Sequence, residues 1–324
     1  MTLRELARLT NYSVSTVSKA FHDAPDVSKE TKEEILRIAK EQGCYLKYHR
    51  EKYQKKIVAL ICPELRSDFY ASAIERLQSM IERDGGLALI STDRFSRTAR
   101  NELLEYYASY LAVDGILVFG LETPPKKGFD IPIVSLLGNR NLHVDHVYVD
   151  TESSILDAVS HLASLGHHHI GFIGESLTDT KEVAFRRAMA RCGLPVDEKA
   201  MIVSSSRFEK AGEEGASRLL AAAPETTAVI AAYDYIAAGA IKHFGDRGLR
   251  VPDDISVIGM DDITASSYME KPLTSISFGT TEAMEIAWDL LKEKMEKRHY
   301  TVLRQIAVAG KLMIRKTTAP PRSN

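Results

Sequence analysis

Hydrophobic positions at the start of the chain recur with the three- and four-residue spacing of amphipathic helices. The pattern occurs in residues 2–10, in residues 13–22 and in a third segment that starts at residue 28. The apolar stripes consist of Leu3, Leu6 and Ala7 in the first segment, Val14, Val17 and Phe21 in the second, and Ile35, Ile38 and Ala39 in the third. Residues at this spacing share one face of a helix. We therefore expect three short helices that bury their stripes in one small core.

Residues that cap helices stand where these segments begin. Thr2 and Glu5 match a capping box, in which each side chain accepts a hydrogen bond from the backbone N–H of the other residue. Ser13 and Ser28 are N-cap candidates for the second and third helices. Asn11 can adopt the turn conformation between the first two. The first two helices are therefore predicted to form a hairpin around a tight turn.

The polar face of the second helix carries small hydroxyl groups and a cation. It consists of Ser15, Ser18, Lys19 and His22. Small side chains allow close approach to a DNA major groove, hydroxyls bond to base-edge donors or acceptors, and a lysine reaches guanine. The pattern thus favours DNA binding, with a capped helical hairpin at a domain edge as the alternative.

Charge is distributed unevenly along the chain. Residues 45–56 hold five Lys or Arg and one acidic residue, interleaved with tyrosines, which suits a surface that contacts phosphates. Residues 1–56 hold 12 Lys and Arg and 8 Asp and Glu, a net charge of +4. The remaining residues hold 30 Lys and Arg and 36 Asp and Glu, a net charge of −6. The first 56 residues are therefore the expected contact for a polyanion.

After residue 56, short apolar runs alternate with amphipathic helical segments. The expected strands are residues 57–62, 87–91, 116–119, 132–136, 170–173, 228–231, 255–259, 273–278 and 302–308. This alternation is typical of parallel sheets covered by helices. The order predicts two doubly wound lobes in series, with the last two strands returning the chain to the first lobe and back.

Composition excludes several classes of protein. With 324 residues, of which 44% are hydrophobic and 27% charged, the chain suits one small domain plus a two-lobed one, and is neither disordered nor collagen-like. Cys44, Cys62 and Cys192 are too few and too far apart for a disulfide framework or a zinc site. There is no apolar run near the roughly 18 residues of a membrane span and no signal-peptide pattern. We expect a cytoplasmic protein without a cofactor or membrane association.

Three motifs stand out: Val14-Ser15-Thr16-Val17-Ser18-Lys19, Val27-Ser28-x-x-Thr31, and the turn Gly259-Met260-Asp261-Asp262. Together they resemble the lactose-repressor (LacI/GalR-type) family of bacterial transcription regulators, and the likeness covers nearly the whole chain. It implies a small all-α helix-turn-helix headpiece plus an α/β two-lobed domain with two doubly wound parallel sheets, similar to type I periplasmic binding proteins.

The resemblance also implies domain limits. The headpiece covers residues 1–44, a basic hinge linker 45–56, and an effector-binding and dimerisation domain 57–324. Within that domain, the first lobe covers about 57–148 plus 275–300, and the second about 149–274 plus 301–324.

The same resemblance implies which headpiece residues contact DNA. Val14, Ser15 and Lys19 take base-reading positions, although Val14 shares the stripe of Val17 and can instead belong to the core. The other DNA-contact candidates, near the backbone or the phosphates, are Thr2, Ser13, Thr16, Ser18, His22, Lys29 and Thr31.

The linker departs from the family pattern. Leu46-Lys47 replaces the usual proline-asparagine step, and Tyr53 stands where members carry a leucine that wedges into the minor groove. We expect the segment to fold on DNA, with Tyr53 as the wedge and Arg50 on a phosphate. A plain basic tether is the alternative.

In the family a small effector binds between the lobes. The positions that match or replace its contacts are Phe69, Tyr70, Lys181, Tyr233 and Asp261. Phe69 and Tyr70 correspond to an aromatic pair that packs against the effector, but they can also be helix-start aromatics that pack on their own lobe. Asp261 follows an expected strand, where open α/β sheets bind ligands. For Asp261 we favour effector contact over capping.

Two of these positions depart from the family. Lys181 stands where an arginine is usual, and an ammonium cannot provide bidentate recognition. Tyr233 replaces the asparagine of an Ala-Asn-Asp turn, and Asp234 is expected to cap the following helix. A sugar is therefore only one option for the effector. Arg207 and Phe208 are weaker candidates.

Three consecutive histidines, His167 to His169, raise the question of a metal site. Consecutive side chains that enter a strand point to alternate faces, and neither a carboxylate nor a cysteine stands at ligand spacing. The family carries a Leu-Gly-His turn here as ordinary structure. We therefore expect no bound metal.

These features predict a sequence-specific DNA-binding transcription regulator, with a repressor favoured, under allosteric control by a small molecule. The expected partners are near-palindromic operator DNA, the effector and a second copy of the chain in a homodimer. An enzyme with a nucleotide cofactor is disfavoured because G-x-G-x-x-G, G-x-x-x-x-G-K-[ST] and G-x-S-x-G are missing. A free-standing solute-binding protein shares the lobes, but it requires export, which the basic N-terminal segment and the missing signal peptide oppose.

Overall fold

The computed structural model describes residues 1–22, 24–48, 55–111, 113–122, 131–137, 144–296 and 302–322. Contacts divide the chain into two compact units. Unit 1 comprises Met1–His146 and Met284–Gln305, and unit 2 comprises Val147–Ala283 and Ile306–Asn324. The chain therefore passes between the units three times.

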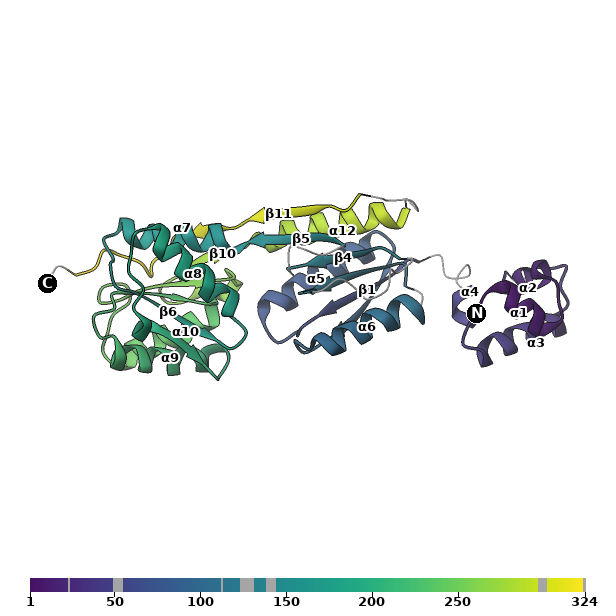
Figure 1. Cartoon of the computed structure of the whole chain (residues 1–324), viewed down its shortest axis with the longest axis horizontal. Coiled ribbons are helices and arrows are strands. Elements are labelled where there is room, and N and C mark those ends of the chain that lie inside the picture. Colours follow the sequence, from purple (N-terminus) through teal and green to yellow (C-terminus); the bar gives the residue numbers. More distant parts are fainter. Residues whose placement is uncertain are drawn as a thin grey trace. The chain divides into compact units, whose positions relative to one another are not determined.

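The first part of unit 1 is a small helical headpiece, residues 1–48, as the apolar stripes predict (Figure 1). Its helices are α1 (Leu3–Thr10), α2 (Val14–Phe21), α3 (Lys29–Glu41) and the single turn α4 (Tyr45–Tyr48). Its buried core consists of Leu6, Ala7, Val17, Ala20, Phe21, Ile35, Ala39 and Cys44. Val14, at the outer end of its stripe, is 42% exposed and lies outside this core.

The predicted helix starts are confirmed by their caps. The Thr2 hydroxyl accepts a hydrogen bond from the N–H of Glu5 at 3.2 Å, and the Glu5 carboxylate accepts one from the N–H of Thr2 at 2.7 Å. The hydroxyls of Ser13 and Ser28 each accept a hydrogen bond from the backbone N–H three residues later. Asn11 takes the left-handed conformation, with φ of 57°, that ends α1. Local sequence therefore sets where α1, α2 and α3 begin.

The rest of unit 1 is built on a six-stranded sheet with helices on both faces (Figure 1). The strand order is β11-β5-β4-β3-β1-β2. The strands are β1 (Ile57–Cys62), β2 (Leu87–Thr92), β3 (Gly115–Phe119), β4 (Ile133–Leu136), β5 (Asp145–Asp150) and β11 (Gln305–Ala309). The helices are α5 (Asp68–Arg83), α6 (Arg97–Ser109) and α12 (Thr280–Glu296). Leu104 of α6 belongs to the same core cluster as Ile116, whereas a Cβ at Gly115 would meet Leu291 of α12 at 3.0 Å. These two helices therefore cover opposite faces.

Unit 2 repeats this architecture with the order β12-β10-β9-β8-β6-β7. The strands are β6 (Ile170–Glu175), β7 (Met201–Ser204), β8 (Ala228–Ala231), β9 (Ser256–Met260), β10 (Thr274–Ser277) and β12 (Lys311–Met313). The helices are α7 (Thr151–Ser164), α8 (Asp179–Arg191), α9 (Phe208–Ala222), α10 (Asp234–Asp246), the short α11 (Thr264–Tyr268) and the 3-10 turn η2 (Glu198–Ala200). Only β12 among these strands is antiparallel to its neighbour, β10. The predicted fold class, a helical headpiece followed along the chain by two doubly wound α/β sheets, is confirmed.

Helices α9 and α10 approach each other closely because of two glycines. A Cβ at Gly212 would lie 2.0 Å from the carbonyl oxygen of Ile236, and one at Gly239 would lie 1.9 Å from that of Glu209. Both distances are far below van der Waals contact. Any larger residue at either position would force the two backbones apart.

The end of the chain differs from the sequence-based lobe limits. β10 pairs with β9, so residues 275–283 lie in unit 2 rather than in the first lobe. Residues 302–305 lie in unit 1, because the N–H of Arg304 donates to Asp145 and its carbonyl oxygen accepts from the N–H of His146. β5, β7 and β12 were not among the expected strands. These pairings join segments far apart in the sequence, which spacing along the chain does not reveal.

Candidate functional site

The exposed face of α2 presents the residues predicted to read DNA. Ser15 and Lys19 are exposed, whereas Val17 is buried. Val14 stands beside them at the start of the helix with 42% of its surface exposed, which opposes its assignment to the core. The face therefore offers one apolar group, hydroxyls and an ammonium at one end of the headpiece.

Hydrogen bonds hold several of these polar groups in place. The Ser13 and Thr16 hydroxyls lie 2.8 Å apart, and Nδ1 of His22 lies 2.6 Å from the carbonyl oxygen of Ser18. Lys19 forms an ion pair with Asp26, in the turn that leads to α3. Most candidates for contact with the DNA backbone are also exposed, namely Thr2, Ser13, His22 and Lys29. Thr31 is partly exposed.

A shallow groove beside this face contains two arginines that sequence reasoning missed. It has a volume of about 450 Å³ and is lined by Arg4, Ala7, Arg8, Asn11, Tyr12, Ser13 and Val14. Their signal in the sequence was their place on the polar side of the first amphipathic segment. Guanidinium groups next to the α2 N-terminus are well suited to phosphates.

The basic linker is described only in part. Arg50 and Tyr53 lie outside the described residues, so their predicted roles stay predictions. Tyr45 and Tyr48, which we grouped with the phosphate-binding tyrosines, pack on Phe21 with ring centroids 6.4 and 5.5 Å away. The Tyr48 hydroxyl also donates to the carbonyl oxygen of Met1 at 2.9 Å. These contacts give both tyrosines a place in the headpiece packing, which corrects that grouping.

In unit 2, three predicted effector residues meet at the carboxyl ends of parallel strands. The ammonium nitrogen of Lys181, on α8, lies 2.7 Å from the carbonyl oxygen of Ala232 and 3.2 Å from Oδ1 of Asp261. It also lies 5.2 Å from the ring centroid of Phe278 and 6.0 Å from that of Tyr233. The residues that directly follow β8 and β9 therefore converge on a cation from α8.

A second cluster of polar residues surrounds Tyr233. Its oxygen accepts a hydrogen bond from the N–H of Phe208 at 3.0 Å, and its hydroxyl donates to Oε1 of Glu175 at 3.4 Å. Burial raises the pKa of Tyr233 to about 12, so it stays protonated. Arg207 pairs with the same Glu175 oxygen at 3.4 Å and stacks on Phe208. The weaker candidates Arg207 and Phe208 thus lie within this cluster. Glu175 was missed, although an acid that ends an apolar strand is a recognisable signal.

The turn after β9 has an unusual backbone. Asp261 and Asp262 have φ of 92° and 49°, in the left-handed region that side chains other than glycine rarely adopt. Ser275 accepts from the N–H of Asp262 at 3.1 Å, and Arg315 pairs with the Asp262 carboxylate at 2.6 Å. Burial raises the pKa of Asp261, and the ammonium of Lys181 opposes this shift. Residues held in this way are frequent at binding sites.

Asp234 does not cap α10, so that expectation was wrong. Its carboxylate accepts hydrogen bonds from the N–H of Ile263 at 2.8 Å and from the hydroxyls of Ser266 and Ser275, both at 2.5 Å. It is 1% exposed, and burial raises its pKa to about 7. A Cβ at Gly259 would lie 2.2 Å from Oδ1 of Asp234, so this packing needs a glycine there. Asp234 instead ties the loop after β9 to α10.

Unit 1 has its own cluster at strand ends, made of aromatic rings. Tyr70 packs edge-to-face on Phe69, Phe95 and Phe119, with centroids 5.2, 6.2 and 5.8 Å away. Phe69 and Tyr70 are half-buried in the first turn of α5, so they both pack on their own unit and keep exposed surface. Phe95, with φ of 62°, is held by a hydrogen bond from its N–H to Asp93 at 2.9 Å. Sequence reasoning missed Phe95, which stands three residues after β2.

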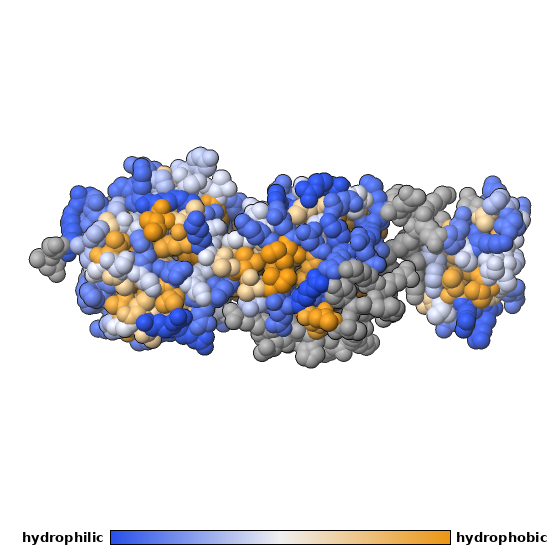
Figure 2. Space-filling view, turned by 90° about the horizontal axis from the view of Figure 1, so that it is seen from above, coloured by the Kyte–Doolittle hydropathy of each residue, from blue (hydrophilic) through white to orange (hydrophobic). Residues whose placement is uncertain are grey.

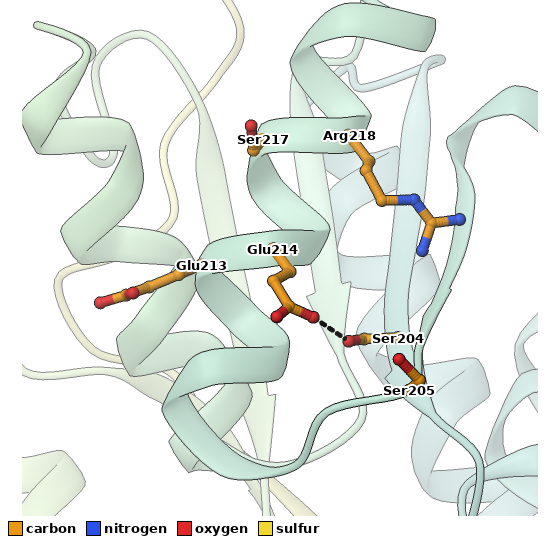
Figure 3. Close-up of a pocket in the computed structure, with 6 residues that line it drawn as sticks. All are labelled: Ser204, Ser205, Glu213, Glu214, Ser217 and Arg218. Atoms are coloured by element: carbon orange, nitrogen blue, oxygen red, sulfur yellow. Dashed lines mark hydrogen bonds between the residues drawn. The ribbon is translucent and has the colours of Figure 1, made fainter.

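A further open pocket of about 580 Å³ lies where β7 leads into α9. Ser204, Ser205, Glu213, Glu214, Ser217 and Arg218 line it, and Figure 3 shows Glu214 turned toward Ser204 while Glu213 points the other way. Glu214 accepts hydrogen bonds from Ser204 at 2.7 Å and Ser206 at 2.9 Å, and Arg218 donates to the carbonyl oxygen of Val203. Because these groups bond to neighbours on β7 and α9, we do not assign the pocket a ligand.

The histidine run is structural at its first position. His167 is buried, with Nδ1 2.8 Å from the Thr227 hydroxyl and Nε2 2.8 Å from the carbonyl oxygen of Ala319. Both ring nitrogens are therefore used. Within the described ranges there is no group of three His, Cys, Asp or Glu residues suited to a metal ion.

Exposed apolar side chains are scattered over each part of the chain. Figure 2 shows hydrophobic patches separated by hydrophilic surface on the visible face. In the described segments, each helix is too short or too polar to span a membrane.

Comparisons with known proteins agree with this architecture. The model for "Bacterial regulatory proteins, lacI family" matches residues 2–49, and that for "Periplasmic binding protein-like domain" matches residues 159–318. The chain is 27% identical to the HTH-type transcriptional repressor CytR of Escherichia coli (strain K12), over 92% of this chain and 91% of CytR.

Solved structures are similar over the same extent. A complex of the transcriptional regulator CelR with cellobiose has a TM-score of 0.70 and 25% identity, and covers 98% of this chain and 99% of its own. The lac repressor dimer bound to operator and the anti-inducer ONPF has a TM-score of 0.72 and 21% identity, with the same coverage. The latter likeness concerns the fold alone. From its headpiece, its two α/β units and these matches, the chain joins a DNA-binding helix-turn-helix domain of the lacI family of bacterial regulatory proteins to a periplasmic binding protein-like domain, and its relatives over nearly the whole length are transcriptional regulators.

Proposed function

We propose that the chain is a transcriptional repressor that binds a near-palindromic operator as a homodimer and is controlled by a small, neutral, hydroxylated effector. The observation that carries the DNA-binding part is the exposed face of α2. Its apolar, hydroxyl and ammonium groups match the thymine methyl and the hydrogen-bonding groups of major-groove base edges. CytR, the similar repressor, and the operator-bound lac repressor dimer support the repressor and dimer assignments.

The headpiece contacts divide into two kinds. Val14, Ser15 and Lys19 are the proposed base readers. The proposed backbone contacts are Thr2, Ser13, Thr16, Ser18, His22, Lys29, Thr31 and, in the linker, Arg50, with Tyr53 as a minor-groove wedge. The capping geometry supports the backbone contacts at Thr2, Ser13 and Thr31, because each lies in the first turn of a helix or at its N-cap, where free N–H groups attract phosphates.

The charges in unit 2 favour a neutral effector. Lys181 is paired with Asp261, Arg207 with Glu175, and Arg315 with Asp262. An anionic ligand would add negative charge beside carboxylates that already balance these three cations. A neutral ligand with hydroxyl groups needs only a mixture of donors and acceptors, which Lys181, Tyr233 and Asp261 supply. The cellobiose bound to CelR supports a sugar.

The aromatic cluster of unit 1 would supply apolar contacts to such a ligand. Phe69 and Tyr70 are half-buried and keep exposed ring surface, and aromatic faces pack well on the C–H groups of a sugar ring. We therefore propose Phe69, Tyr70, Lys181, Tyr233 and Asp261 as effector contacts.

The remaining assignments follow from this function. We propose a cytoplasmic location, where the operator is, and we assign no catalytic role. For the domain limits, we propose 57–324 for the effector domain and move the expected boundary between headpiece and linker from residue 44 to residue 48, because Tyr45 and Tyr48 pack on Phe21.

One experiment tests the proposal in two steps. Purified protein is incubated with random duplexes, bound sequences are selected, and affinity for the selected site is compared with a scrambled duplex. We expect a near-palindrome and a loss of about 0.9 log units in affinity per phosphate contact for each log unit of salt. Release of that site is then screened against neutral sugars and their phosphorylated forms. Equal affinity for selected and scrambled duplexes would overturn the function, and release by phosphorylated forms alone would overturn the neutral effector.

A further inference from the structure

Lys19 and Asp26 form an ion pair on the DNA-facing side of the headpiece. Lys19 lies in the last turn of α2, and the backbone then folds back: the N–H of Ala24 donates to the carbonyl oxygen of Lys19 at 3.1 Å, and that of Val27 to Ala24 at 3.3 Å. This turn carries Asp26 to the exposed face of α2. The Lys19 and Asp26 side chains are 48% and 55% exposed. A pair this exposed contributes little to folding. Because it lies beside the proposed base readers, both of its charged groups are available to a ligand on that face.

Resting on the proposed DNA-binding function, we propose that Lys19 and Asp26 act together as one reader of a single G·C base pair. The Lys19 ammonium donates to O6 or N7 of guanine, and the Asp26 carboxylate accepts from the 4-amino group of the paired cytosine. Asp26 is thereby a second specificity-determining residue, and it lies outside the helix that carries the other readers.

The geometry of the base pair matches the ion pair. Guanine O6 and cytosine N4 are joined by a Watson–Crick hydrogen bond and lie about 2.9 Å apart. The nitrogen and oxygen of a contacting ammonium–carboxylate pair are separated by a similar distance, about 2.7–2.9 Å. A donor beside an acceptor on the protein therefore faces an acceptor beside a donor on the DNA. C·G and A·T pairs present the reverse order, with the donor first. A T·A pair keeps the order, but it carries the thymine methyl where guanine offers N7, so the ammonium loses one acceptor and meets an apolar group.

Lys19 and Asp26 can stay paired while each of them also contacts a base. An ammonium has three N–H donors, of which Asp26 uses one, and a carboxylate has about four acceptor sites. The hydrogen bond from Lys19 lowers the pKa of Asp26, so the carboxylate is ionised and accepts only. The phosphates of DNA repel an ionised carboxylate. This repulsion is offset when a cation lies beside the carboxylate and a hydrogen-bond donor of a base faces it. The cytosine amino group is that donor.

The test uses half-sites selected with the wild-type protein and measures affinity for all four base pairs at each position. Lys19→Ala and Asp26→Ala are compared with Glu41→Ala, which removes the same charge from an exposed pair with Arg37 on α3. We expect the wild type to prefer G·C about tenfold at one position per half-site. Both variants should lose that preference at the same position, the double variant should lose no more than either single one, and Glu41→Ala should keep it.

A second arm changes the DNA and compares the wild type with Asp26→Ala. Cytosine at that position is replaced by pyrimidin-2-one, which lacks the 4-amino group. The analogue should weaken binding of the wild type several-fold and leave Asp26→Ala unchanged. The inference is overturned if Asp26→Ala raises affinity equally for every sequence, if the two variants lose preference at different positions, or if the analogue weakens both proteins equally. Failure of the wild type to prefer any duplex would instead overturn the proposed function.

Discussion

The ammonium nitrogen of Lys181 lies 3.2 Å from Oδ1 of Asp261, and this contact joins α8 to the strained turn after β9. The side chains are only 21% and 14% exposed. Removing both charged groups from water costs free energy, and an apolar pair of similar size would avoid that cost. This cost is consistent with a binding role, and it makes the pair a sensitive position for mutation.

Lys181→Met should destabilise unit 2, because it leaves the Asp261 carboxylate largely buried without its cation. We expect a loss of about 1–3 kcal/mol in the free energy of unfolding, measured in urea. Lys181→Met with Asp261→Asn should recover more than half of it. The matched control is Lys242→Met, whose exposed pairs with Glu213 and Asp246 predict less than about 1 kcal/mol. Strict additivity of the two changes would contradict coupling through the pair.

Asp234 should make stability depend on pH in a defined direction. Its pKa rises from 3.8 to about 7 on folding, so between these values the folded state binds the proton more tightly. Its contribution to stability is therefore full in acid and is lost as the pH rises through 7. The unfolding free energy of the wild type relative to Asp234→Asn should fall by about 2–3 kcal/mol between pH 5 and pH 8. If the unfolding free energy of the wild type relative to Asp234→Asn does not fall with pH, the carboxylate is ionised throughout.

Val14 and Val17 differ by three positions and should respond oppositely to the same change. Val14→Ala removes an exposed side chain, so the unfolding free energy of the headpiece should change by less than about 0.5 kcal/mol while operator affinity falls several-fold. Val17→Ala opens a cavity in the buried core and should cost about 2 kcal/mol of stability. Thermal unfolding and operator titration measure both quantities. A large loss of stability in Val14→Ala would contradict its assignment as an exposed base reader and would indicate that it packs in the core.

Gly212 and Gly245 offer a matched pair on packed helices. Gly212→Ala would place a methyl group 2.0 Å from the carbonyl oxygen of Ile236, so α9 and α10 must separate, at a cost of about 2–3 kcal/mol in unfolding free energy. Gly245→Ala, where a Cβ meets nothing within 4 Å, should stabilise α10 by up to about 1 kcal/mol. Urea unfolding of both variants checks the sign of each change. If both variants changed the unfolding free energy by the same amount, the close contact between α9 and α10 would carry no cost.

The sequence by itself determined the headpiece and the class of the fold. Thr2, Ser13 and Ser28 cap helices through the backbone three residues later, and the apolar stripes repeat within a few residues. Such interactions are local, so spacing along the chain is enough to predict them. The alternation of apolar runs and helices likewise implied parallel sheets.

The tertiary structure alone decided which polar groups meet. Asp234 has a capping residue's place in the sequence, yet its carboxylate bonds to Ser266 and Ser275, 32 and 41 positions away. Glu175 joins Tyr233, and Asp26 folds back to Lys19, through contacts that no period along the chain encodes. Buried polar groups must find partners wherever the fold brings donors and acceptors together, and that depends on strand order and loop path rather than on neighbouring residues.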